Sequence, residues 1–144
     1  MPVPNSGSSV ATAVAVVAGG ASGAGRELVE ALARRGFAVV VVYLGDQRRA
    51  EAVVDDVLAT GAAALAVRAD VDDHLDVQRV FDETSCAFGG VDVVVQAAPA
   101  AAEVLFEHAE RRLRWGGTTL TVSGPDEVAD ALARIDWWRR TAAG

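Results

Sequence analysis

The feature that most constrains the fold is a glycine-rich turn between an apolar run and a helical pattern. The run over residues 10–17 is continuous in Val, Ala and Thr, which is typical of a strand buried on both faces of a parallel sheet. The turn over residues 18–25 follows, and the amphipathic segment 26–35 predicts a helix. A strand, a glycine loop and a helix in this order point the N–H groups of the first helical turn at a site where phosphate can bind.

The remainder of the chain alternates between strand and helix patterns in the same way. Strands are predicted over residues 10–18, 37–43, 62–69, 91–96 and 118–123, and helices over residues 23–35, 47–60, 99–115 and 125–138. A further helix, capped by Asp72 or Asp73, is predicted to run to residue 88. Right-handed crossovers join such units into a doubly wound parallel sheet with helices on both faces. We therefore expect a single compact α/β domain with five strands in the order 3-2-1-4-5 and a ligand crevice between the first and fourth strands.

Polar residues predict where several helices begin and end. Asp46 is the expected N-cap of the second helix, and Ser123 is the expected cap of the fifth. The fourth helix is expected to run up to Gly116, so that Glu110 and Arg114 form a favourable i,i+4 pair on its outer face.

Charge and cysteine content narrow the class of partner and the compartment. The formal net charge is −7, which argues against nucleic acid or an anionic membrane as the main partner. The apolar run near the N-terminus is too short to span a bilayer, and no targeting segment is visible. Cys86 is the only cysteine, so we expect a reduced, cytoplasmic setting and a packed or half-buried thiol. His74 and His108 are expected to lie far apart on helix surfaces, with no metal site.

Four short segments together match the pattern of a known family. The turn over residues 18–25 matches Thr-Gly-x-x-x-Gly-x-Gly except that Ala18 replaces Thr, and residues 70–71 are Asp-Val. The run 91–95 leads into Gln-Ala-Ala-Pro at 96–99, where the family has Asn-Asn-Ala-Gly. From its first through its fourth predicted strand, the chain resembles the short-chain dehydrogenase/reductase family, and within it the reductases of the 3-oxoacyl-carrier-protein type.

The resemblance implies a Rossmann-like NAD(P)-binding domain over residues 10–144. Residues 1–9 are rich in Pro, Ser and Gly, which predicts a flexible tail before this domain. The cofactor contacts that it implies come from the loop and from strand ends, at Gly19, Ser22, Gly23, Ala24, Gly25, Tyr43, Asp70, Val71, Ala97 and Ala98. Asp46 lies at the spacing of a ribose-binding carboxylate. Arg48 and Arg49, in contrast, lie in the first turn of the second helix and can approach a 2′-phosphate. The expected cofactor is NADP or NAD, with NADP favoured.

The second half of the family's pattern is missing from these 144 residues. Members carry a catalytic Ser followed by a Tyr-x-x-x-Lys motif, but all 13 basic residues here are Arg and the one tyrosine is Tyr43. In the family, the Lys lowers the pKa of the Tyr, which for an unperturbed phenol is near 10. Arg cannot replace Lys as a proton-relay partner because its pKa is too high. Only Ser123 matches or adjoins a catalytic position, and the catalytic residues are otherwise unknown.

Three functions are compatible with this pattern. The favoured one is a dinucleotide-binding protein without the family's catalysis, serving as a non-catalytic subunit or a cofactor-responsive protein. The second is an enzyme with altered chemistry, either an oxidoreductase or a non-redox lyase or isomerase, that uses Ser22, Gln96, Ser123 or Asp126. The third is a structural, oligomeric domain in which the cofactor loop is a relic.

Tryptophans point to a contact between chains. Trp115, Trp137 and Trp138 gather around the ends of the fourth and fifth predicted helices, which in the family build the main dimer interface. They either cover an apolar patch in a homodimer or in a complex with a full-length relative, or they pack within the core.

Overall fold

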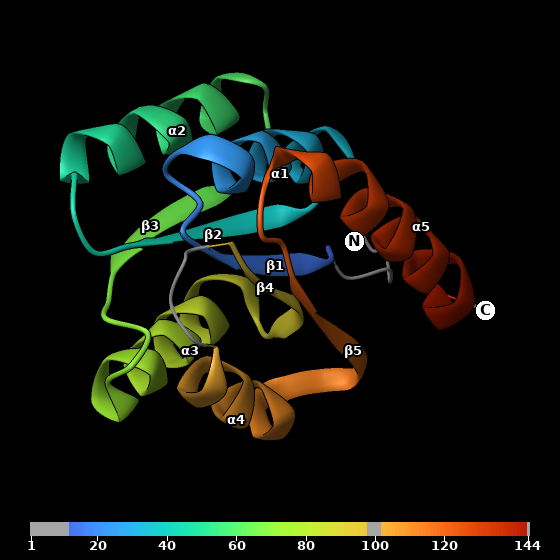
Figure 1. Ribbon diagram of the computed structural model, residues 1–144. Helices are drawn as coiled ribbons and strands as arrows, with labels where there is room; N and C mark the ends of the chain where they lie inside the picture. The colour runs from blue at the N-terminus through green and yellow to red at the C-terminus, as the bar shows by residue number, and fades with distance from the viewer. Residues whose placement is uncertain (1–11, 98–101, 144) are drawn as a thin grey trace, which may run out of the picture.

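Five parallel strands form the central layer of the computed structural model, which describes residues 12–97 and 102–143 (Figure 1). The strands are β1 (Val14–Ala18), β2 (Ala38–Tyr43), β3 (Ala64–Arg68), β4 (Val91–Gln96) and β5 (Leu113–Thr121). Their order is β3-β2-β1-β4-β5, and every pair of neighbours is parallel. The predicted doubly wound sheet and its order are therefore confirmed, whereas the predicted tail over residues 1–9 lies outside the described residues.

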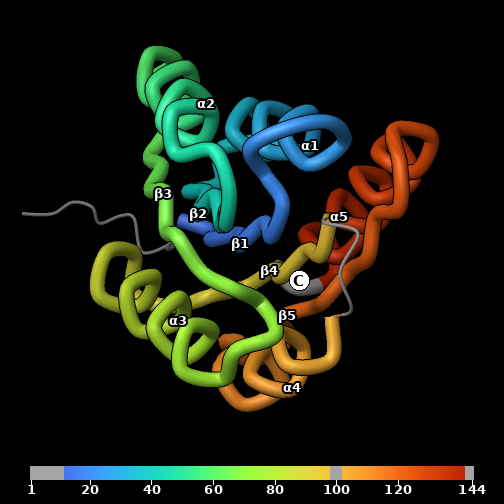
Figure 2. Tube along the Cα trace, turned by 60° about the vertical axis from the view of Figure 1, so that its left-hand side comes forward, coloured from blue at the N-terminus to red at the C-terminus, as the bar shows by residue number. Residues whose placement is uncertain are grey.

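Helices cover both faces of this sheet, as predicted. They are α1 (Gly23–Arg34), α2 (Gln47–Ala59), α3 (His74–Phe88), α4 (Glu103–Arg112) and α5 (Val128–Ala143), and a short 3-10 turn, η1 (Pro125–Glu127), precedes α5. Figures 1 and 2 show α1, α2 and α5 on one face and α3 and α4 on the other. Over residues 12–97 and 102–143, none of the helices is both long enough and apolar enough to cross a bilayer.

The continuous Val and Ala runs explain why the inner strands are buried on both sides. Successive side chains of a strand point to opposite faces, so a strand covered on both faces must be apolar at every position. In β1, Val17 packs toward α1, α2 and α5, whereas Val16 packs toward α3 and α4. Every residue of β1 is fully buried, which places this strand at the centre of the core.

The predicted boundary between the fourth helix and the fifth strand is wrong. α4 ends at Arg112, and Arg114 already belongs to β5, so the predicted pair with Glu110 does not form. Arg114 instead makes a two-pronged ion pair with Asp92 of β4, with Nε–Oδ1 at 3.0 Å and Nη2–Oδ2 at 2.7 Å. The apolar spacing typical of a helix continues past the end of α4. The ion pair between Arg114 and Asp92 instead holds this segment as a strand beside β4.

β5 bends away from its neighbour just after this ion pair. Leu113 lies opposite Val91 and Thr118 lies opposite Val93, so the residues in between form an irregular bulge. Gly116 takes up the bend with a φ of +82°, a left-handed conformation that side chains disfavour. The segment predicted to end a helix thus forms a bulge in an edge strand.

The two predicted helix caps have different outcomes. The Asp46 side chain accepts a hydrogen bond from the Arg49 N–H at 3.2 Å, which confirms Asp46 as the N-cap of α2. Ser123 is not the cap of the fifth helix, because Gly124 is the N-cap of the intervening 3-10 turn. The backbone N–H of Ser123 instead donates to a carboxylate oxygen of Glu127 at 2.8 Å, so the side chain that bonds here comes from inside the turn.

Candidate functional site

A groove of about 300 Å³ opens where the chain leaves β1, β2 and β4 at the carboxyl ends of the strands. Its lining includes Gly19, Ser22, Tyr43, Asp46, Arg49 and Ala97. Strand order reverses between β1 and β4, and doubly wound sheets bind ligands at such a switch point. The groove therefore lies where the fold is expected to hold a ligand.

The glycine loop is folded tightly against the start of α1. A Cβ atom added at Gly25 would lie 2.0 Å from the carbonyl oxygen of Gly19, closer than any real contact allows. Gly19 has a φ of +80°, and its N–H donates to the Val42 carbonyl at 2.9 Å, which ties the loop to β2. Only a residue without a side chain fits at position 25, so this glycine is required by the close approach of loop and helix.

The N-terminus of α1 is open toward the groove. The first hydrogen bond within the helix runs from the Arg26 N–H to the Ser22 carbonyl at 3.2 Å, so the N–H groups of Gly23, Ala24 and Gly25 precede the helical ladder. Gly23 has a φ of +58°, and a Cβ atom added there would meet nothing within 4 Å. The first turn of α1 contains no acidic residue. This combination suits an anion, because free N–H groups and the helix dipole both favour negative charge.

The structure brings together some of the predicted cofactor-binding residues but not all of them. Gly19, Ser22, Tyr43 and Ala97 line the groove, and Gly23 to Gly25 form the adjacent helix start. Ala98 lies outside the described residues.

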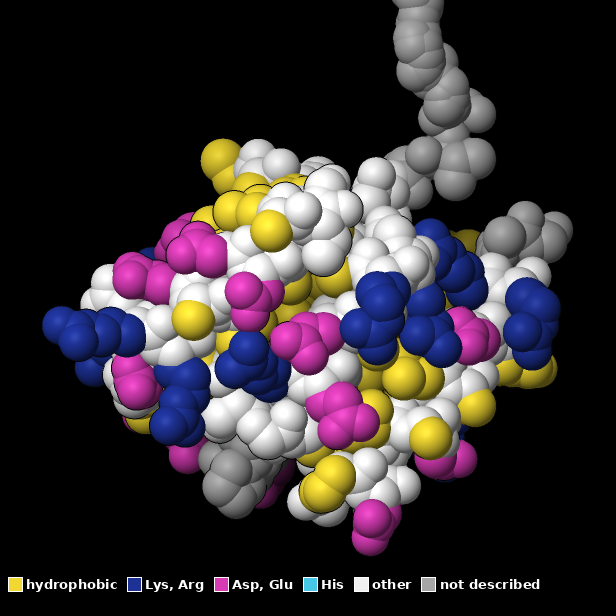
Figure 3. Space-filling model, turned by 90° about the horizontal axis from the view of Figure 1, so that it is seen from above, with side chains coloured by type: hydrophobic (Ala, Val, Ile, Leu, Met, Phe, Trp, Pro, Cys, Tyr) yellow, Lys and Arg dark blue, Asp and Glu magenta, His cyan; other side chains and the backbone are white. Residues whose placement is uncertain are grey.

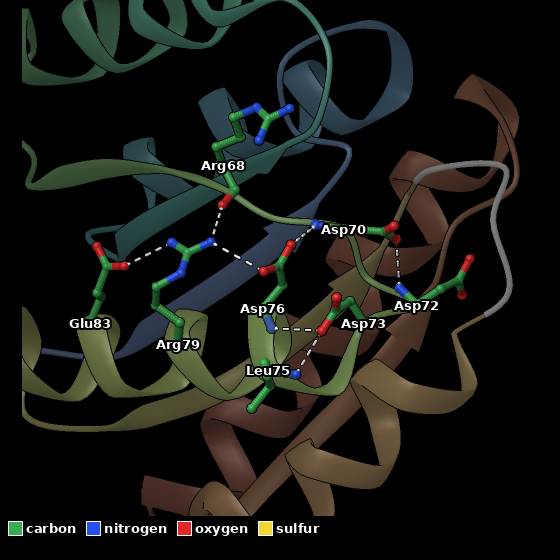
Figure 4. A network of polar contacts seen from close by, with 8 residues as sticks. All are labelled: Arg68, Asp70, Asp72, Asp73, Leu75, Asp76, Arg79 and Glu83. Atoms are coloured by element: carbon green, nitrogen blue, oxygen red, sulfur yellow. Dashed lines mark hydrogen bonds and ion pairs between the residues drawn. The ribbon is translucent and has the colours of Figure 1, made fainter.

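Asp70 and Val71, which follow β3, are not part of the groove lining. The Asp70 N–H donates to the Asp76 carboxylate at 2.9 Å, and its own carboxylate accepts from the Asp72 N–H at 2.9 Å (Figure 4). Asp73 caps α3 by accepting from the Leu75 N–H at 2.9 Å. The structure thus assigns the side chain of Asp70 to a turn that leads into α3.

Sequence reasoning missed three lining residues, Ala21, Leu44 and Gly45. Leu44 and Gly45 stand directly after β2, so their place next to a strand's carboxyl end was the available signal. Of the two arginines considered for a 2′-phosphate, Arg49 lines the groove and Arg48 does not. Arg49 lies 3.9 Å from the Asp46 carboxylate, which places a cation and an anion side by side at this end.

The residues considered for altered chemistry lie in different surroundings. Gln96 ends β4 with only 1% of its surface exposed, and its backbone carbonyl accepts from the Val122 N–H at 2.9 Å. Ser123 and Asp126 are exposed beyond the end of β5, and Asp126 lines a separate hollow. Ser22 alone of these four belongs to the groove.

The two histidines lie in contact, so the expectation that they are far apart is wrong. His74 Nδ1 is 3.1 Å from His108 Nε2, because α3 and α4 pack side by side on one face of the sheet. Within the described residues, no group of three or more His, Cys, Asp or Glu side chains gathers as a metal site requires. Cys86 is exposed, which corrects the expectation of a packed thiol.

The surroundings of His108 predict a loss of stability in acid. Partial burial lowers the pKa of His108 from its ordinary value of 6.5, and the neighbouring Arg111 and His74 lower it further. The folded protein then binds fewer protons than the unfolded chain, so the stabilisation present above pH 6.5 is lost as the pH falls toward the folded pKa. We expect the unfolding free energy from urea denaturation to fall less in His108→Gln than in the wild type over this range. Equal losses in the two proteins would contradict the prediction.

The three tryptophans divide between the two predicted roles. Trp138 packs on Phe37 with ring centroids 6.5 Å apart, and its indole N–H donates to the Gly116 carbonyl. Trp115, in contrast, is 99% exposed on β5, and Trp137 is 61% exposed on α5. Trp138 therefore belongs to the fold, while the other two are available for contacts.

Charges of both signs share the face formed by α1, α2 and α5. Figure 3 shows Arg side chains interspersed with Asp and Glu side chains across this surface. Arg26, for example, pairs with Glu30 at 3.3 Å and with Asp56 at 3.0 Å. In this view, the face therefore has no broad patch of side chains with the same charge.

Comparisons with known proteins agree with this geometry. A family model described as short chain dehydrogenase matches residues 13–118. A hydroxynaphthalene reductase-like protein of Metarhizium guizhouense is 40% identical over 87 residues, which cover 60% of this chain and 33% of that protein. A 3-oxoacyl-acyl-carrier-protein reductase of Staphylococcus aureus is 38% identical over 87 residues, which cover 60% of this chain and 35% of that protein.

Solved structures show the same likeness. A short chain dehydrogenase from Burkholderia cenocepacia, crystallised in complex with NADP, aligns with a TM-score of 0.67 and 29% identity. The alignment covers 74% of this chain and 53% of that one, so the 144 residues correspond to about half of the solved relative and about a third of the curated relatives. With the family model matching most of its length, the chain belongs to the short-chain dehydrogenase family.

Proposed function

We propose that the protein binds NADP(H), or NAD(H) more weakly, in the groove at the carboxyl ends of β1 and β2. The observation that carries the proposal is the open N-terminus of α1, where Gly23 leaves free space beside three N–H groups that precede the helical ladder. A pyrophosphate fits such a position because it can approach the backbone closely. The NADP complex of the relative from Burkholderia cenocepacia supports the same ligand class.

Calorimetric titration with NADPH, NADP⁺, NADH and NAD⁺ tests this proposal. We expect heat of binding that is larger and of higher affinity for the two phosphorylated forms. Native mass spectrometry of the purified protein provides an independent measurement, because a retained dinucleotide adds a defined mass. Absence of heat with all four dinucleotides, together with a spectrum of bare protein, would refute the proposal.

Arg49 is the proposed partner of the 2′-phosphate. It lines the groove beside Asp46, whereas Arg48, its neighbour in sequence, does not. A charge-assisted hydrogen bond contributes about 1.5–3 kcal/mol, so Arg49→Ala should weaken NADPH binding by about tenfold or more. NADH binding should change little, because NADH lacks the phosphate.

Arg48→Ala is the matched control for this prediction, since it removes the same charge from the same helical turn. We expect NADPH affinity in that variant to stay close to the wild-type value. Equal losses in the two variants would mean that only the general positive charge of this turn matters. A loss of NADH affinity as large as that of NADPH would assign Arg49 to another part of the dinucleotide.

We further propose that this unit binds the dinucleotide without performing the family's carbonyl reduction. A bound nicotinamide supplies hydride transfer, but reduction of a carbonyl also needs a proton donor at the reacting oxygen. The 144 residues contain no Lys, and Tyr43 lines the groove at the end of β2 instead of standing in a Tyr-x-x-x-Lys helix. A non-catalytic subunit or a cofactor-responsive protein is the role that these residues support.

Association with a second chain, either another copy or a full-length relative, belongs to the same proposal. The exposed Trp137 lies on α5, one of the two helices that the family resemblance implicates, and the exposed Trp115 lies on β5, shortly after the other, α4. Large aromatic side chains are enriched at protein interfaces, which supports a contact through β5 and α5.

We also propose that the protein works in a reducing, cytoplasmic compartment, where the exposed Cys86 would remain a free thiol.

A further inference from the structure

His74 and His108 bring two imidazole nitrogens together from different helices. His74 Nδ1 lies 3.1 Å from His108 Nε2, and the ring centroids are 5.3 Å apart, so the two nitrogens face each other. Figures 1 and 2 show α3 and α4 side by side, and each of these helices carries one of the two histidines. His74 is exposed and His108 is half-buried, so solutes can reach the pair.

Contacts other than the histidines also hold α3 and α4 in place. Asp73 caps α3 by accepting from the Leu75 N–H at 2.9 Å, which fixes the start of the helix at His74 (Figure 4). About two turns further along α3, Asp82 accepts from Arg112 of α4 at 2.8 Å. A ligand that needs both rings therefore finds them close together on helices that are already joined.

The separation of the two nitrogens suits a shared metal ion. Metal–nitrogen bonds of about 2.0–2.1 Å, at angles between square and tetrahedral, place two ligand nitrogens about 2.8–3.4 Å apart, and the observed 3.1 Å lies in this range. Rotation of the rings can turn both lone pairs toward one ion, because the terminal torsion of histidine is broad. Histidine binds metals through either nitrogen, so Nδ1 of one ring and Nε2 of the other are both suitable ligands.

The surroundings of the pair limit the kind of metal site. Within residues 12–97 and 102–143, no group of three or more candidate ligands gathers, so water would complete the coordination. Arg111 acts on His108 more strongly than Glu107 does, and this positive charge weakens the binding of a cation. Imidazole suits Cu²⁺, Zn²⁺ and Ni²⁺, whereas Mg²⁺ and Ca²⁺ prefer oxygen. The expected site is therefore an open one that exchanges its ion, unlike a closed structural centre.

We propose that His74 and His108 chelate a divalent transition-metal ion, Zn²⁺ or Cu²⁺ foremost, and that the bound ion links α3 to α4. Each ring binds through the nitrogen that faces the other ring and keeps its proton on the opposite nitrogen. The ion replaces the hydrogen bond between the rings. It stabilises the folded chain, because only there do the two helices meet. Metal binding at this pair does not depend on dinucleotide binding.

Calorimetric titration of the tag-free chain with zinc chloride tests the proposal. We expect one ion per chain. His74→Gln and His108→Gln should each lower the affinity at least about tenfold, since loss of an outer-shell partner alone costs about 10–100-fold. Cys86→Ser is the control, because an exposed thiol is an alternative zinc ligand, and this variant should bind like the wild type. Magnesium chloride should give no heat, and circular dichroism verifies that the variants are folded.

Two further measurements distinguish a metal link from a contact that only packs the helices. At a Zn²⁺ concentration about ten times the Kd, the folding equilibrium constant of the wild type should rise about elevenfold, with little change in the two glutamine variants. Electron paramagnetic resonance of Cu²⁺ on the Cys86→Ser chain should show splitting by two nitrogens, and by one in either histidine variant. A wild type that binds no Zn²⁺, or binding that survives both histidine substitutions or is lost in Cys86→Ser, would overturn the proposal.

Discussion

A Gly23→Asp variant is expected to lose dinucleotide binding almost completely while keeping its fold. Asp tolerates the left-handed conformation that Gly23 adopts, with a φ of +58°, and a side chain there meets no neighbour within 4 Å. Its carboxylate would occupy the start of α1, where the helix dipole favours a negative charge. The same carboxylate would exclude and repel a pyrophosphate, so we expect NADPH affinity to fall by about a hundredfold or more, roughly 3 kcal/mol.

Gly23→Asn separates repulsion from obstruction, because its side chain has nearly the same size but no charge. We expect Asn to weaken binding less than Asp, with both variants unfolding at denaturant concentrations close to that of the wild type. Titration calorimetry gives the affinities, and urea denaturation gives the stabilities. Unchanged affinity in Gly23→Asp would place the phosphate elsewhere, and the proposed site would then be wrong.

The second large effect is expected on stability, from Gly25→Ala. The added Cβ would lie 2.0 Å from the Gly19 carbonyl oxygen and 3.0 Å from the Gly20 Cα, both of them backbone atoms that cannot rotate away. The loop or α1 must shift to relieve the overlap, and overpacking of this kind costs up to about 3 kcal/mol. We therefore expect the free energy of unfolding, measured by urea denaturation, to fall by about this amount.

Gly45→Ala is a matched control for this stability experiment. Position 45 also follows a strand near the groove, but a Cβ added there meets nothing within 4 Å. Its unfolding free energy should stay within about 0.5 kcal/mol of the wild type. A Gly25→Ala protein as stable as this control would show that the loop can move away from α1 at little cost.

The parts of the fold that sequence predicts well are those determined by local pattern. The Val and Ala runs of β1 and β2 are typical of strands in a sheet covered on both faces, and the glycine turn indicates a strand before it and a helix after it. Strand order followed from right-handed crossovers together with the doubly wound arrangement of dinucleotide-binding sheets. The groove lining at Gly19, Ser22 and Tyr43 followed in turn, because these residues stand where the loop and β2 end.

Several of the wrong predictions depended on contacts between distant segments. Arg114 leaves the helical pattern because Asp92, 22 residues earlier, provides a partly buried partner in the adjacent strand. His74 and His108 meet because two helices pack together across 34 residues of sequence. Arg49, rather than Arg48, lines the groove because of the rotation of α2 about its axis, which periodicity alone does not fix relative to a neighbouring loop.

The central place of β1 has a consequence for how the chain is made. β1 is the first strand to leave the ribosome, but its partner β4 follows much later, since Val14 and Asp92 are 78 residues apart. At about 5–20 residues per second, synthesis of that interval takes roughly 4–16 s. Throughout this time one edge of a fully apolar strand has no partner. We therefore expect the nascent chain to be most prone to aggregation before β4 is available.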